Sequence, residues 1–135
     1  MNKFILAKVS SMETDEDGRE KRIMGKYLVN ALSYTECEAK IAQYGLSEYE
    51  IDSLAKAKYG EYILDKNASN YYVVKSYFIS LDEKTGREKK SLVKTLVSAF
   101  DLENAKDIYK ELMSGSVFDY EVISISDTKI DDIIT

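Results

Sequence analysis

The sequence predicts an α+β fold built as a tandem duplication of one β-β-α-β unit, with antiparallel sheet and two helices related by a pseudo-twofold axis. The main observation is an internal repeat: residues 18–31 align without gaps on residues 86–99, with eight identities among fourteen positions. About one identity is expected by chance at average residue usage. In both copies, turn-forming residues separate two β-prone runs, and a helix-capping sequence follows the second run. We therefore expect six strands and two helices in two equal halves.

The two copies cover residues 3–64 and 71–135, and together they predict a single domain of 135 residues. Beyond the ungapped block, Lys8 aligns with Lys75 after a small shift of register. Such shifts fall where turns and loops are expected, which is where insertions are tolerated. Residues 64–70 form the linker. The sequence leaves open whether the halves form one sheet or two, and it does not give the strand order.

Each copy begins with a predicted β-hairpin and ends with a third strand. The runs concerned are rich in Val, Ile, Tyr and Phe, which favour strands. Asp15 and Gly18 mark the turn of the first hairpin, and Asp82 and Gly86 mark that of the second, with Gly available for a positive φ. The predicted strands are residues 4–13, 20–32, 48–54, 71–81, 88–100 and 120–126.

A helix is predicted between the second and third strand of each copy. Residues 35–38 have the form of a capping box with Thr35 as the N-cap, and Asp101 occupies the N-cap position in the second copy. Gly45 and Gly115 are the predicted residues just past the helix ends. The apolar stripes expected to face the core are Ala39, Ala42 and Tyr44 in the first helix, and Ala105, Ile108, Tyr109 and Leu112 in the second.

The composition argues against a conventional enzyme. The chain has no His, so the commonest general base and metal ligand is missing, and its one cysteine, Cys37, is not enough for a zinc site. Gly-rich phosphate loops are also missing from the sequence. We therefore predict no catalytic residues, no metal and no cofactor.

Charge and cysteine content bear on location and partners. A net charge of -5 and a pI near 4.9 argue against a general coat protein of duplex DNA, but they leave room for a local basic face. A lone cysteine suits a reducing compartment, and no apolar run approaches the ~18 residues of a membrane span. We expect a cytoplasmic protein without membrane contact, in which Cys37 is a small, partly buried residue.

The candidate binding site is a basic cluster just after each predicted hairpin turn. Since both copies place it at the same point, we interpret the pair as a clamp for a phosphate backbone, with nearby aromatic rings that stack on exposed bases. The predicted nucleic-acid-binding residues are Arg19, Lys21, Arg22, Arg87, Lys89, Lys90, Tyr27, Tyr71, Tyr72 and Tyr77, with Phe78 beside them. Two plainer interpretations stay open: mixed-charge tips are normal for exposed turns, and strand tyrosines usually pack in cores or subunit interfaces.

Two acidic segments have a plainer explanation than a site. Residues 15–17 lack the ligand spacing and closing Glu of a calcium loop, so a turn is the better interpretation. Asp131 and Asp132 resemble the acidic, apolar-ended tips by which some single-strand-binding proteins recruit partners. Because Ile134 aligns with Ile63 of the first copy, we interpret this segment as the end of the repeat.

Three segments carry a family resemblance. They are Lys-Tyr-Leu-Val-Asn-Ala-Leu-Ser-Tyr-Thr-Glu-Cys-Glu-Ala (26–39), Ala-Lys-Tyr (57–59) and Ser-Ile-Ser-Asp-Thr-Lys-Ile-Asp-Asp-Ile (124–133). With them the chain resembles, over nearly its whole length, a family of small proteins of unknown function from Bacteroides-type gut bacteria and their phages. The resemblance implies a phage or mobile-element context and a cytoplasmic location, and it brings no catalytic residues.

Together these observations predict a non-enzymatic binding protein whose ligand is single-stranded DNA or RNA. The alternative is a protein–protein interaction module, either an inhibitor of a host factor or defence system or a structural homodimer. The net acidity, the 11 tyrosines and the apolar run at residues 71–81 support that alternative.

Overall fold

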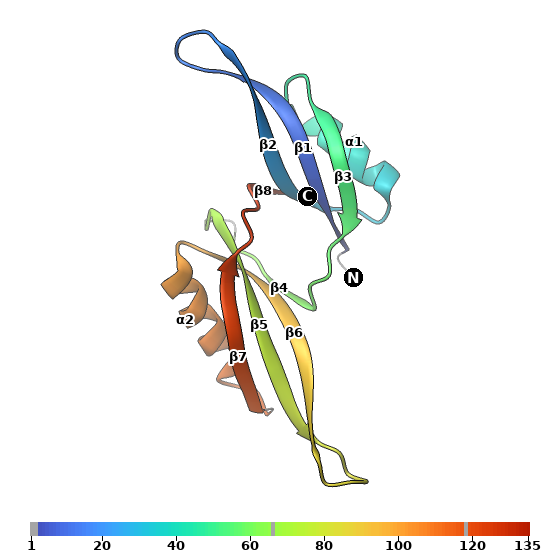
Figure 1. The fold of residues 1–135 in the computed structure, drawn as a ribbon, viewed down its shortest axis with the longest axis vertical. Helices are drawn as coiled ribbons and strands as arrows, with labels where there is room; N and C mark the ends of the chain where they lie inside the picture. Colours follow the sequence, from blue (N-terminus) through green and yellow to red (C-terminus); the bar gives the residue numbers. More distant parts are fainter. Residues whose placement is uncertain (1–2, 66, 118) are drawn as a thin grey trace. The chain divides into compact units, whose positions relative to one another are not determined.

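The computed structural model describes residues 3–65, 67–117 and 119–135 and confirms the α+β fold class. These residues form eight strands in two four-stranded sheets, with two helices (Figure 1). The chain divides into two compact units. The first unit comprises Met1–Ala57 and Ile130–Thr135, and the second comprises Lys58–Lys129.

The sheet of the first unit has the strand order β3-β1-β2-β8. The long strands β1 (Phe4–Thr14) and β2 (Glu20–Asn30) pair antiparallel, β3 (Glu50–Lys56) pairs antiparallel with β1, and β8 (Asp132–Ile134) runs parallel to β2. Helix α1 (Tyr34–Tyr44) packs on one face of this sheet. The buried core between helix and sheet consists of Ile5, Ala7, Val9, Tyr27, Val29, Ala31, Cys37, Ile41 and Ile134.

The sheet of the second unit has the order β4-β6-β5-β7. Strands β5 (Asn70–Leu81) and β6 (Glu88–Ala99) form its long hairpin, β7 (Asp119–Asp127) pairs antiparallel with β5, and β4 (Glu61–Ile63) runs parallel to β6. Helix α2 (Leu102–Met113) covers one face. The core there consists of Tyr72, Val74, Val97, Ala99, Ala105, Tyr109 and Met113.

Each of the two short strands, β4 and β8, pairs in a different sheet from the strand that precedes it in the sequence. Strand β4 follows β3 along the chain but pairs with β6, and β8 follows β7 but pairs with β2. The sequence copies at 3–64 and 71–135 therefore do not coincide with the compact units, because each copy ends in the sheet of the other unit. Six strands were predicted. Strands β4 and β8 were not predicted, because each has only three residues and so shows no usable periodicity.

Both hairpin turns have the predicted chemistry. The Asp15 carboxylate accepts hydrogen bonds from the backbone N–H groups of Asp17 and Arg19, at 3.0 and 2.8 Å. Gly18 at φ +79° and Gly86 at φ +70° occupy the left-handed region, which glycine enters without a Cβ clash. In the second turn the Asp82 carboxylate accepts from the Lys84 N–H at 2.9 Å, so Asp15 and Asp82 both have a structural role as turn acceptors.

The first helix begins two residues earlier than expected, and Thr35 as its N-cap is wrong. The cap is Ser33, whose Oγ accepts from the Glu36 N–H at 3.1 Å, while the Glu36 carboxylate accepts from the Leu32 N–H at 2.9 Å. A variant of the capping box is thus present two residues upstream of the predicted one, with the carboxylate bonded to the N–H just before the cap. Asp101 is confirmed as the N-cap of α2, accepting from the Asn104 N–H at 2.7 Å.

The buried face of α1 also differs from the prediction. Cys37 and Ile41 are buried, whereas the predicted Ala39, Ala42 and Tyr44 are exposed. Alanine carries too little apolar area to mark a face, so the spacing of small residues gave the wrong side.

The stripe of α2 is confirmed at Ala105 and Tyr109, while Ile108 is half-buried, Leu112 is exposed and Met113 takes its place in the core. Gly45 is confirmed in the left-handed conformation at the end of α1. Helix α2 instead has Ser114 as its cap in the right-handed conformation, and Gly115, the next residue, does not take a positive φ.

Candidate functional site

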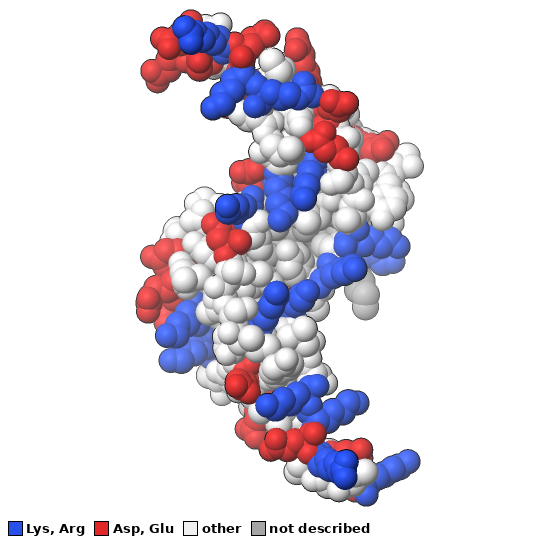
Figure 2. Space-filling view, viewed as in Figure 1, with Lys and Arg blue, Asp and Glu red and all other residues white. Residues whose placement is uncertain are grey.

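The six basic residues of the hairpin tips are all exposed, but they do not share one face. Side chains alternate along a strand. Tyr27 and Val29 of β2 face the helix, so Lys21 lies on that same side and Arg22 on the opposite, open side. By the same count on β6, Lys89 lies on the helix side and Lys90 on the open side. Figure 2 shows mixed blue and red atoms at each tip.

Acidic residues of the edge strands pair with the open-side cations. The Arg22 Nη2 lies 2.9 Å from the Glu50 Oε2 of β3, and the Lys90 Nζ lies 3.6 Å from the Glu121 Oε2 of β7. Lys90 also sits over the Tyr77 ring, 5.8 Å from its centroid. Exposed pairs of this kind contribute little stability. They do reduce the positive charge that each tip offers to a phosphate.

Three of the four tyrosines predicted to stack on bases are buried. Tyr27, Tyr71 and Tyr72 are only 7–8% exposed, and Tyr77 is half-buried. Tyr27 belongs to the core of the first unit, where its ring contacts that of Tyr44 at a centroid distance of 5.4 Å. A buried ring does not offer its face to a base, so these three side chains serve packing.

A second arrangement of lysines lies on the open face of each sheet, which is the face opposite the helix. Only part of this face is exposed, because Leu28 and Leu96, two residues beyond Lys26 and Lys94 on it, are fully buried. In the first unit Lys8 of β1 stands directly opposite Lys26 of β2, and Ser53 of β3 stands opposite Lys8 on its other side. In the second unit Lys75 of β5 stands opposite Lys94 of β6, with Ser124 of β7 on the other side. We call these two three-residue sets the lysine rows. Figure 2 shows Lys and Arg atoms over the middle of β1 and β2.

The row of the second unit carries an electrostatic cost that no ion pair among the described residues relieves. Like charges placed directly opposite one another destabilise an antiparallel pair. Neither row contains an acidic residue, and among the described residues Lys8, Lys75 and Lys94 form no ion pair. Two lysines stand opposite one another at the corresponding place in both sheets, although in the first sheet the Asp131 carboxylate accepts the Lys26 backbone N–H and so lies beside the row. An anion that bridges the two ammonium groups of a row would remove the repulsion.

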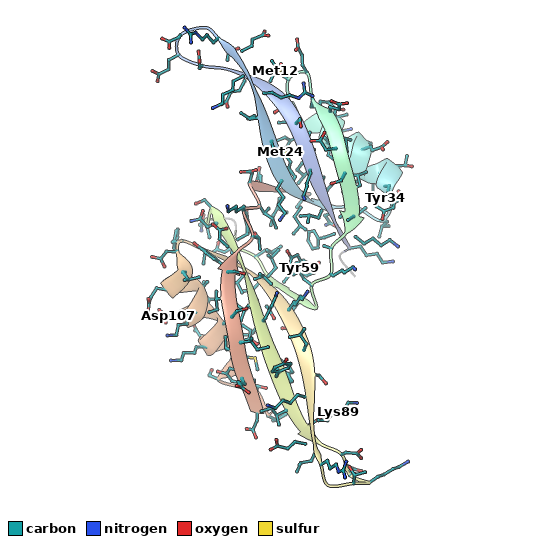
Figure 3. The ribbon with its side chains drawn as sticks, viewed as in Figure 1. Met12, Met24, Tyr34, Tyr59, Lys89 and Asp107 are labelled. Carbon is teal, nitrogen blue, oxygen red and sulfur yellow. The ribbon has the colours of Figure 1, made fainter. Side chains whose placement is uncertain are left out.

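Apolar side chains flank the lysine rows on the same open face. Met24 precedes Lys26 by two residues on β2, and Leu92 precedes Lys94 by two residues on β6. They are 70% and 53% exposed. Figure 3 labels Met24 on β2. Each row therefore combines two cations with one exposed apolar side chain.

The repeat alignment contained the signal for these rows. Lys8 matches Lys75 and Lys26 matches Lys94, but the alignment alone does not say which residues stand opposite one another. Counting outward from the turn gives the register, since Thr14 pairs with Glu20 and Lys8 then falls on Lys26. The basic residues of the hairpin tips were predicted instead because their charges lie close together in the sequence.

Other groups offer no sign of catalysis or metal binding in the part of the chain that the structure describes. No set of three or more Cys, Asp or Glu residues there is arranged to hold a metal ion. The Cys37 side chain is fully buried, and burial raises the pKa of its thiol, which keeps the group protonated. Neither described helix is long and apolar enough to cross a membrane.

Comparison with known proteins gives a family and no function. No curated protein and no solved structure matches the chain. A family model does match, over residues 3–135, and its description is a domain of unknown function. The chain therefore belongs to the DUF4494 family.

Proposed function

We propose that this chain is a non-enzymatic protein that binds single-stranded nucleic acid on the open faces of its sheets. The observation that carries the proposal is the pair of lysine rows, which repeats the same like-charge opposition in both sheets. In each row the two ammonium groups contact a phosphate, and the serine hydroxyl of the neighbouring strand supplies a further donor.

The surroundings of the rows suit a single strand better than a duplex. An open sheet face presents side chains to unstacked bases and to the backbone at once. Met24 and Leu92 offer exposed apolar surface for a base or sugar beside each row. With a net charge of -5, attraction to a polyanion has to come from local cations, so we expect binding at low salt that weakens steeply as salt is added.

The hairpin tips have a secondary role in this proposal. Arg19, Lys21, Arg87 and Lys89 form no ion pair among the described residues, so they remain available for phosphates that lie beyond the rows. Arg22 and Lys90 are engaged by acidic neighbours and contribute less.

The setting we propose is the cytoplasm of a bacterium, in a phage or mobile-element context. The resemblance to small proteins of Bacteroides-type bacteria and their phages supports the context. The single thiol, buried and unpaired at Cys37, supports a reducing compartment.

A protein partner is the second candidate, and one observation favours it. Exposed apolar residues occur just before and just after the N-cap of both helices, as Leu32 and Tyr34 in the first unit and as Phe100 and Leu102 in the second. Such pairs suit a host protein or a second copy of the chain. A partner that stays bound after nuclease treatment and is released on replacing Phe100 by Ser would favour this candidate.

Fluorescence anisotropy of labelled single-stranded DNA and RNA tests the main proposal. We expect Lys75→Gln with Lys94→Gln to weaken binding about tenfold or more, because two ammonium groups that neutralise phosphates are removed. The charge-matched control is Lys106→Gln with Lys110→Gln, two exposed lysines of α2, and it should bind within twofold of the parent chain. Equal affinities for both variants, or no binding by the parent chain at low salt, would contradict the proposal.

A further inference from the structure

A cavity of about 390 Å³ opens on the second unit where the chain enters β4. It lies between the segment that leads into β4 and the middle of β6. Its lining residues are Lys58, Tyr59, Gly60, Leu92, Val93 and Lys94. Lys94 belongs to a lysine row, so this cavity adjoins the open-face site and adds Lys58 to it as a further cation.

The backbone holds the two walls of the cavity together. The Gly60 N–H donates a hydrogen bond to the Lys94 carbonyl oxygen at 2.8 Å, directly before β4 starts to pair with β6. The Tyr59 and Tyr62 rings form a T-shaped pair at a centroid distance of 5.8 Å, which restricts the position of Tyr59. Lys58, Tyr59, Leu92 and Lys94 thus line one cavity from two segments that the backbone hydrogen bond joins.

The first unit has the same backbone arrangement but a different side chain. There the Asp131 N–H donates to the Lys26 carbonyl oxygen at 2.7 Å, as Gly60 does to Lys94. The Asp131 carboxylate then accepts the Lys26 N–H at 2.8 Å. The first unit therefore places a negative charge where the second unit has glycine.

Steric reasons do not require glycine at position 60. Its φ lies outside the positive range, and a Cβ there would stand 3.7 Å from both the Lys94 carbonyl oxygen and the Val93 Cγ1, an ordinary contact. A side chain would fit the backbone but would project into the space beside Lys94. The missing side chain leaves room for a ligand and removes the carboxylate that would repel an anion.

We propose that this cavity is a subsite for one nucleotide, with the phosphate between Lys58 and Lys94 and the base against Tyr59 and Leu92. The volume lies at the small end of the roughly 300–1,000 Å³ range of ligand pockets, which suits a single nucleotide. The subsite rests on the proposed function, because it gives one nucleotide of a bound strand a fixed place beside the Lys75–Lys94 row.

The test is an NMR titration of the full chain with AMP, with adenosine and inorganic phosphate as separate probes. We expect AMP to shift the amide signals of Gly60 and Lys94, and to bind at least about tenfold more tightly than either probe. The decisive variant is Gly60→Asp, which copies Asp131 of the first unit and should weaken AMP binding about tenfold or more. Gly60→Asn is its neutral control of nearly equal size and should weaken binding less.

Two results would overturn the subsite: AMP shifts that are absent from Gly60 and Lys94, or Gly60→Asp binding AMP as tightly as Gly60→Asn does. Thermal unfolding of each variant shows whether it is folded. Oligonucleotide binding with no AMP binding would remove the subsite and leave the lysine rows standing. AMP binding without oligonucleotide binding would remove the proposed function instead.

Discussion

The ring of Tyr27 lies over Gly25 on the helix-facing side of β2, so that a Cβ at Gly25 would stand only 2.6 Å from the Cε2 of Tyr27. Tyr27 is buried, so its ring has little room to retreat. At the corresponding positions of β6 the second unit has Val93 and Thr95, where the smaller threonine leaves space for a side chain. Each unit therefore fills this part of its core with a different pair of residues: Gly25 with Tyr27 in the first unit, and Val93 with Thr95 in the second.

The first prediction concerns that pair. We expect Gly25→Ala to lower the free energy of unfolding by about 1–3 kcal/mol, the usual cost of overpacking a core. In a Tyr27→Ala background the same change should cost much less, because the ring is gone. Denaturant unfolding of the four chains in this double-mutant cycle measures the difference, and equal costs in both backgrounds would contradict the packing described.

The second prediction concerns a buried hydrogen bond. The hydroxyls of Ser76 and Tyr109 lie 2.6 Å apart, and both residues are almost fully buried. Tyr109→Phe leaves the serine hydroxyl without this partner and should cost about 1–3 kcal/mol. Adding Ser76→Ala should recover part of that cost. Chemical denaturation checks both values, and a double variant as unstable as the sum of the single ones would count against the bond.

The third prediction is a loss of stability at high pH. A hydrogen bond to the Asp132 carboxylate, helped by burial, raises the pKa of Tyr44 to about 12, whereas tyrosine in an unfolded chain ionises near 10. The contribution of neutral Tyr44 is therefore complete below about pH 10 and disappears as pH rises from about 10 to about 12. The difference in stability between the parent chain and Tyr44→Phe should shrink over that interval. A difference independent of pH would contradict this assignment.

The fourth prediction tests the placement of β8. Ile134 lies in the core of the first unit although it ends the second sequence copy, and we expect Ile134→Ala to cost about 2–5 kcal/mol. Cys37 lies in the same core and is the single cysteine, so its labelling by a thiol reagent reports opening of that unit. Labelling should accelerate in Ile134→Ala and change little in Val117→Ala, an exposed position of the second unit. Equal labelling rates would exclude β8 from this core.

Local sequence signals were enough to predict those elements that are determined by residues close together in the chain. The two hairpins, their glycine turns and the Asp101 cap follow from residues close together in the chain, and all are present. Strands β4 and β8 could not be predicted, because each consists of three residues that become a strand only beside a partner distant in sequence. The duplication itself stays an inference from the alignment, supported by the matching order of elements in the two units.

The candidate site was predictable only in part. The sequence indicated duplicated basic residues, but a charge cluster says nothing about which side of a sheet each side chain takes. The burial of Tyr71 and Tyr72 could not be predicted, since tyrosine suits both a core and an exposed platform. The lysine rows required the register between strands, which the turn positions supply once the pairing is known.

The salt dependence of oligonucleotide binding tests the central claim most directly. Log affinity decreases linearly with log salt concentration. The steepness of this decrease is reduced by about 0.7 for each phosphate of a single strand that the protein no longer neutralises. Because each row holds one phosphate, replacing Lys8, Lys26, Lys75 and Lys94 together by Gln should reduce the steepness of this dependence by about 1.4, with weaker binding at every salt concentration. A slope unchanged by these four substitutions, in a variant that remains folded, would show that the lysine rows do not contact the nucleic acid.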